Sequence, residues 1–85
     1  MSVEKELNEI YDGILGCDLA IETSLYGNQP GEEVEKIMLH WLHKLLRLSE
    51  EIPELQHLQY AIQEAAHNFD VTYIISELEK LGIGE

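Results

Sequence analysis

The apolar residues of this chain recur every three or four positions, a spacing that places them on one face of an α-helix. In the first part of the sequence the repeat runs through Val3, Leu7, Ile10, Ile14, Cys17, Ile21 and Leu25. Similar stripes run through residues 55–69 and 71–81. No stretch alternates with the period of two that a half-buried strand requires. The sequence therefore predicts an all-α protein.

Residues that begin or end helices separate these stripes. Gly27 and Pro30 mark a loop, and Pro53 pushes the residue before it out of the helical conformation. Asp70 can cap a last helix, and Gly82 can end it. We therefore expect helices over residues 2–26, 30–51, 53–69 and 70–82. They form a small helical bundle of about four helices in a single domain, residues 1–85, with the two long helices as a central hairpin and the two shorter ones packed on it.

The core is expected to draw on the stripes of all four helices. Its predicted members are Leu7, Ile10, Ile14, Ile21, Val34, Ile37, Trp41, Leu45, Leu58, Ile62, Phe69, Ile74 and Leu78. On a helical wheel the apolar arcs of the first two helices each span roughly 200°, against about 140° for the third. The two short helices do not cover all of this surface, so we expect a homodimer built on one of the long helices.

Asp18 is unusual because it falls inside the apolar arc of the first helix, where a bare carboxylate is costly. In one interpretation it is paired, hydrogen-bonded or held at a subunit boundary. In the other, the helix bends at Gly13 and Gly16 and turns Asp18 toward solvent. The two glycines can instead allow another helix to approach closely.

Charge restricts the choice of partner more than any motif does. The chain carries 17 acidic residues against 5 lysines and arginines, a formal net charge of -12. This excess disfavours direct nucleic acid binding, which needs basic side chains to replace the counterions of the phosphates. It favours a protein partner with a basic surface. The alternative is that the acids only keep a small protein soluble.

Catalytic and metal-binding patterns are too sparse to predict an enzyme or a cofactor. Cys17 is the single cysteine and lies on a core stripe, which is typical of a small buried hydrophobe. His40 and His43, or Glu64 and His67, supply too few ligands for zinc or a di-iron site. No apolar stretch approaches the ~20 residues of a membrane span. The first residues show no secretory signal, so a cytoplasmic location is expected.

The candidate contact residues are charged or aromatic and are expected on exposed helix faces. Helix 30–51 places its basic residues on one polar arc, called here the basic strip: Lys36, His40, His43, Lys44 and Arg47. This strip contacts an anionic partner or is balanced by the protein's own glutamates. The residues predicted to bind a partner are Glu9, Asp12, Lys36, His40, His43, Arg47, Glu50, Glu51, Glu54 and Tyr60.

These features favour a non-catalytic, acidic protein–protein interaction module, such as a small inhibitor, an immunity protein or a chaperone, that binds a basic partner surface. The alternative is a structural or regulatory subunit that acts as a homo- or hetero-oligomer through an apolar helix face. Salt dependence separates the two, because charge-steered binding weakens with ionic strength and apolar docking hardly changes.

Overall fold

The structure is a computed structural model that describes residues 3–23 and 31–84. Two long helices, α1 (Val3–Thr23) and α2 (Gly31–Glu51), are followed by a 3-10 helix, η2 (Pro53–Leu58), and two short helices, α3 (Gln59–Asn68) and α4 (Thr72–Lys80). The described residues contain no strand. The prediction of an all-α bundle is therefore confirmed.

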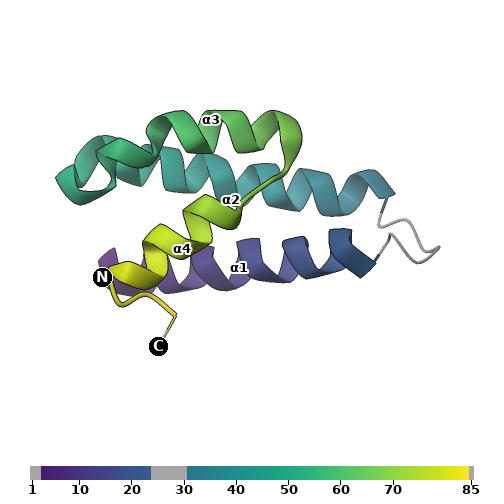
Figure 1. Ribbon diagram of the computed structural model, residues 1–85, viewed down its shortest axis with the longest axis horizontal. Coiled ribbons are helices and arrows are strands. Elements are labelled where there is room, and N and C mark those ends of the chain that lie inside the picture. The colour runs from purple at the N-terminus through teal and green to yellow at the C-terminus, as the bar shows by residue number, and fades with distance from the viewer. Residues whose placement is uncertain (1–2, 24–30, 85) are drawn as a thin grey trace.

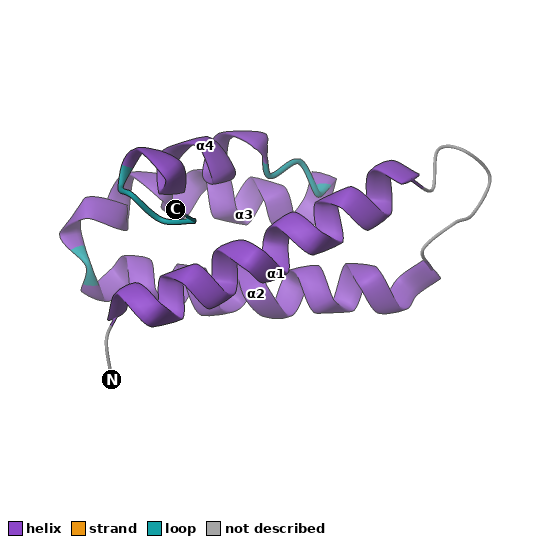
Figure 2. Ribbon diagram, turned by 90° about the horizontal axis from the view of Figure 1, so that it is seen from below, coloured by secondary structure: helices purple, strands orange, loops and turns teal. Residues whose placement is uncertain are grey.

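The helices form a closed arrangement around one core. α1 and α2 lie side by side as a hairpin (Figure 1), and α2 also contacts η2 and α3. α4 contacts both α1 and α3, so it closes the bundle. Figure 2 shows α3 and α4 along the same side of the α1–α2 pair. No other described helix covers the opposite side of that pair.

The predicted break at Pro53 is confirmed by the backbone. Residues 53–69, however, form a 3-10 helix followed by α3, and the last helix begins at Thr72, two residues later than predicted. Ile52, before Pro53, has an extended conformation with φ -106° and ψ 112°. The Thr72 amide donates to the Asp70 carboxylate at 3.2 Å, although Val71 holds the N-cap position of α4. This bond lowers the pKa of Asp70 because it favours the ionised carboxyl. The expected loop signals Gly27 and Pro30 lie outside the described residues.

The C-terminal turn closes α4 and docks on α1. Gly82, with φ 87°, and Ile83 donate backbone hydrogen bonds to the carbonyls of Glu79 and Leu78, as expected for a glycine-terminated helix. Two more bonds then reach α1: the Tyr11 hydroxyl donates to Glu79 at 2.6 Å, and the Gly84 amide donates to the Asn8 side chain at 2.9 Å. These bonds hold the C-terminal turn against the first half of α1.

Phe69 makes the turn between α3 and α4. Its φ of 58° lies in the left-handed region, which costs a residue with a side chain roughly 1–2 kcal/mol. The Phe69 amide donates to the Ala65 carbonyl at 2.8 Å, and the half-buried ring packs against the core. These contacts hold the backbone in the conformation that directs α4 back toward α1.

Burial confirms most of the predicted core. The buried apolar side chains are Leu7, Ile10, Tyr11, Ile14, Cys17, Met38, Leu42, Leu45, Leu55, Leu58, Ile62, Ala65, Val71, Ile74, Leu78 and Ile83. Four predicted core residues are only partly buried against this cluster: Ile21, Val34, Trp41 and Phe69. The prediction for Ile37 is wrong, because this side chain is 50% exposed.

The error at Ile37 arises from how α2 is rotated about its axis. Met38, Leu42 and Leu45 are fully buried, so the centre of the buried face lies one position further along than the predicted stripe through Ile37 and Trp41. α2 contacts α1 on one side and η2 and α3 on the other. The middle of its broad apolar arc is therefore covered, and one edge of the arc reaches solvent.

Gly13 allows α2 to approach α1 closely, which is one of the interpretations given above for the two glycines. A methyl group at this position would overlap the Trp41 indole, whereas one at Gly16 would meet nothing within 4 Å. α1 is continuous through both glycines, from Val3 to Thr23. Asp18 is half-buried on this continuous helix.

Candidate functional site

The basic strip lies on the solvent face of α2, opposite the buried side chains of that helix. Lys36, His40, His43, Lys44 and Arg47 are all exposed. At about 100° per residue, all five fall within one arc of roughly 100° on the helix. Their exposure agrees with the predicted basic strip, since a polar arc needs only the helix period to define it.

The strip has no intramolecular carboxylate partner among the described residues. The ion pairs among the described residues join Glu77 to Lys80 and Glu77 to His57, each at 2.9 Å, and neither involves the strip. Inside the strip, the Lys44 ammonium lies 5.3 Å from the centroid of the Trp41 ring, and the His40 ring meets the same indole edge-on at 5.4 Å. Two basic side chains thus contact the tryptophan, and no glutamate among the described residues forms an ion pair with either of them.

A second charged feature, the corner cluster, surrounds the end of α2. It consists of Glu50, Glu51 and Glu54, which are all exposed. No basic residue lies in the last turn of α2, and none of the three makes an ion pair with another described residue. The carbonyl groups at a helix C-terminus already carry partial negative charge, so acids there are electrostatically unfavourable.

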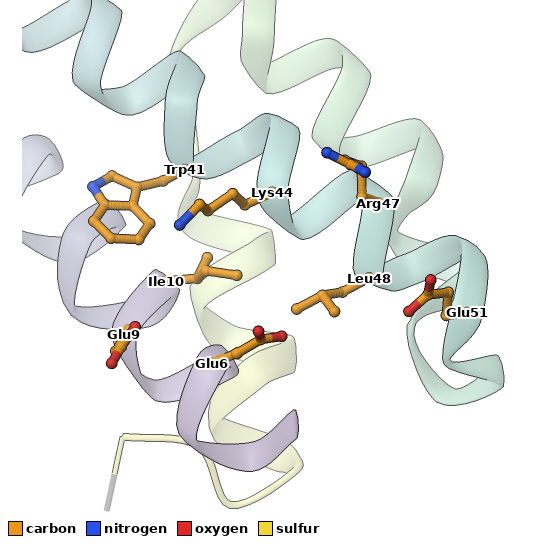
Figure 3. A pocket seen from close by; sticks show the side chains of 8 residues that line it. All are labelled: Glu6, Glu9, Ile10, Trp41, Lys44, Arg47, Leu48 and Glu51. Carbon is orange, nitrogen blue, oxygen red and sulfur yellow. The ribbon is translucent and has the colours of Figure 1, made fainter. Parts of the chain in front are cut away.

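The α1–α2 groove connects the two charged features. It has a volume of about 280 Å³ and is lined by Glu6, Glu9, Ile10, Trp41, Lys44, Arg47, Leu48 and Glu51. Figure 3 shows Lys44 extending from α2 toward α1, with Leu48 pointing toward Ile10 and the carboxylate of Glu6 nearby. The α1 wall of the groove is acidic and the α2 wall is mainly basic. Between the walls, apolar side chains form the floor.

The structure brings some of the predicted contact residues together and leaves others apart. Glu9, Arg47 and Glu51 line the α1–α2 groove. Asp12, Glu50 and Glu54 are exposed but do not line it. Tyr60, 73% exposed, lines a different groove between α3 and α4.

The predicted contact set missed five residues of the α1–α2 groove: Glu6, Ile10, Trp41, Lys44 and Leu48. Ile10 had been assigned to the core, and Lys44 had been placed only in the basic strip. Trp41 was assigned to the core, and its stripe with Lys44 and Leu48, at spacings of three and four residues, is the signal that identifies this wall. The acidic wall follows from the packing of α1 against α2, which the sequence does not show.

Groups suited to catalysis or metal binding are scarce in the described part of the chain. Burial raises the pKa of the Cys17 thiol, which keeps it in the less nucleophilic, protonated form. No group of three or more His, Cys, Asp or Glu residues with the geometry for a metal ion occurs within residues 3–23 and 31–84. Within the same ranges, no helix has the length and apolar character to cross a membrane.

Comparison with known proteins adds no relative. No family model matches the chain, and neither the curated proteins nor the solved structures compared with it give a match. The surfaces described above therefore carry the functional interpretation.

Proposed function

We propose that this protein is a non-catalytic interaction module whose acidic surface binds a basic surface on a protein partner. Small inhibitors, immunity proteins and chaperones are the classes of protein that work in this way. The net charge of -12 supports the proposal, because it attracts basic partners and repels nucleic acid. We expect the interaction to take place in the cytoplasm, where a lone thiol such as that of Cys17 stays reduced.

The corner cluster is the observation that carries this proposal. Its three carboxylates are exposed, lack an ion pair with any described residue, and gather where the α2 C-terminus is already negative. Acids at the start of a helix, such as Glu33, are explained by favourable interaction with the helix dipole. Glu54, in the first turn of η2, shares that explanation, whereas Glu50 and Glu51, at the end of α2, have none within the fold. A basic partner would supply the missing counter-charge.

Reversing two charges of the corner cluster is expected to separate binding from folding. In Glu50→Lys/Glu51→Lys, the free energy of unfolding should stay the same or rise, by about 0.3–1 kcal/mol for each charge placed favourably at the helix C-terminus. Capture of partners from a lysate of the source cell, at low and at high salt, should show proteins that wild type retains only at low salt. The double variant should lose them.

A matched control distinguishes the corner cluster from net charge alone. Glu33→Lys/Glu35→Lys changes the charge by the same amount at exposed positions near the other end of α2. This control should lower stability, because it places cations near a helix N-terminus, and should retain more of the captured partner. Equal losses from the two variants, or capture that is insensitive to salt, would contradict the proposal.

A second candidate function is self-association through the α1–α2 groove, as a structural or regulatory subunit. Ile37 is 50% exposed and lies on the same stripe of α2 as the half-buried Trp41, so an apolar edge reaches solvent beside the groove. The walls of the groove carry opposite charges. A two-fold axis parallel to the groove would place the acidic wall of one copy, with Glu9, against the basic wall of the other, with Lys44.

Charge reversal and its repair test this second candidate. Wild type should sediment as a dimer at micromolar concentration, Lys44→Glu should sediment as a monomer, and Glu9→Lys/Lys44→Glu should regain dimer mass because the swapped walls are again complementary. Raised salt should weaken this dimer less than it weakens capture by the corner cluster, since the floor of the groove is apolar. A wild-type monomer at high concentration would exclude this dimer.

A further inference from the structure

A second groove runs between α3 and α4, apart from the surfaces that carry the proposed function. It is a broad depression, open to solvent, with a volume of about 670 Å³. α3 forms one wall and the first turns of α4 form the other, while the sharp turn at Phe69 sets the two helices beside each other. We refer to it as the α3–α4 groove.

Each wall of the α3–α4 groove presents an exposed tyrosine. Tyr60 on α3 is 73% exposed, and Tyr73 on α4 is 53% exposed. Exposed tyrosines are over-represented among the anchoring residues of protein interfaces, because a rigid ring offers a large apolar face and a polar tip. Here each of the two helices that form the groove contributes one tyrosine ring to its lining.

The charged groups that line this groove are all acidic. They are Glu64, from the middle of α3, and Asp70, from the turn before α4. The bond from the Thr72 amide lowers the pKa of Asp70, so the carboxylate stays ionised and fixed in position. The Lys80 cation on α4 is paired with Glu77 at 2.9 Å and does not line the groove. The groove therefore complements a cation that also has a flat face.

We infer that the α3–α4 groove binds an arginine side chain on an exposed segment of the partner protein. A guanidinium group stacks on aromatic rings and also pairs with carboxylates through its planar fork of donors, whereas a lysine ammonium lacks the flat face. Tyr60 and Tyr73 supply the rings, and Glu64 and Asp70 supply the carboxylates. The inference rests on the proposed function, and names the side chain by which a basic partner is anchored.

Titration with a short peptide tests the inference without the natural partner. The probe is a blocked glycine–serine peptide with two arginines, and the comparison peptides carry two lysines or two citrullines, citrulline being the neutral counterpart of arginine. Followed by NMR on the wild-type protein, the arginine peptide should shift the amide signals of Tyr60, Glu64, Asp70 and Tyr73 in a saturable way. It should bind about tenfold more tightly than the citrulline peptide, with the lysine peptide between them.

Two groove variants and one control complete the experiment. Tyr60→Leu keeps an apolar side chain but removes the ring together with the hydroxyl that hydrogen-bonds Glu64. Asp70→Asn keeps an oxygen that can accept from Thr72 but removes the charge. Each should weaken arginine-peptide binding about fivefold. Glu35→Gln removes one exposed charge outside both grooves and outside the corner cluster, and should have little effect. Circular dichroism verifies that all three variants are folded.

The inference is overturned if the shifts spread evenly over the acidic surface, or if Glu35→Gln weakens binding as much as Asp70→Asn does. It is also overturned if the citrulline peptide binds as well as the arginine peptide. None of these results bears on partner capture by the corner cluster, which is measured separately with Glu50→Lys/Glu51→Lys. Failure of the groove and failure of the proposed function are thus distinguishable.

Discussion

Leu42→Ala is expected to lower the free energy of unfolding by about 2–5 kcal/mol, among the larger effects of a single substitution in a domain of this size. Leu42 is fully buried at the centre of the α2 face that packs inside the bundle. Truncation removes apolar contacts and leaves a cavity that its neighbours on several helices cannot all move to fill. Urea denaturation followed by circular dichroism measures the change.

Ile37→Ala is the matched control, since it removes a similar volume from the exposed edge of the same helix. This side chain is 50% exposed, and the substitution should change stability by only about 0.5 kcal/mol. Trp41→Ala should fall between the two, below the about 3–5 kcal/mol expected of a fully buried tryptophan, because Trp41 is half-buried. If Ile37→Ala costs as much as Leu42→Ala, then α2 is rotated relative to the arrangement described.

The contrast between these residues shows where sequence reasoning about the fold succeeds. On α1, α3 and α4 the predicted stripes coincide with the buried faces, as at Ile14, Ile62 and Leu78. On α2 the apolar arc is broader, and period alone cannot say which part of a broad arc is covered. The elements packed against α2, namely α1, η2 and α3, decide which part of the arc is covered. Even Ser49 becomes fully buried, with its hydroxyl donating to the Leu46 carbonyl at 2.6 Å.

The candidate sites also differ in whether the sequence alone could predict them. The basic strip and the corner cluster each lie on a single stretch of chain, so helix period and sequence proximity were enough to find them. The two grooves depend on how separate helices meet. The α3–α4 groove depends on the left-handed conformation of Phe69, which is unusual for a bulky residue and has no signature in the sequence. Tyr60 could be predicted as exposed, but Tyr73 could not be predicted to line the same groove.

Gly13→Ala is expected to destabilise the protein even though alanine is a better helix former than glycine. The added methyl group would overlap the Trp41 indole, and overpacking of this kind typically costs about 1–3 kcal/mol. The gain in helix propensity, about 1 kcal/mol, offsets only part of that cost. Trp41 is the single tryptophan of the chain, so its fluorescence should shift to longer wavelength as the ring is displaced toward water.

A double-mutant cycle isolates the contact between Gly13 and Trp41. In a Trp41→Ala background the overlap is absent, so Gly13→Ala should now stabilise by up to about 1 kcal/mol. The resulting coupling of about 1–3 kcal/mol measures the close approach of α1 and α2. Gly16→Ala, which meets nothing within 4 Å, should stabilise by a similar amount in either background. If Gly13→Ala and Gly16→Ala behave alike in the Trp41 protein, the indole does not lie over Gly13, and the tryptophan at the edge of the α1–α2 groove is positioned by other contacts.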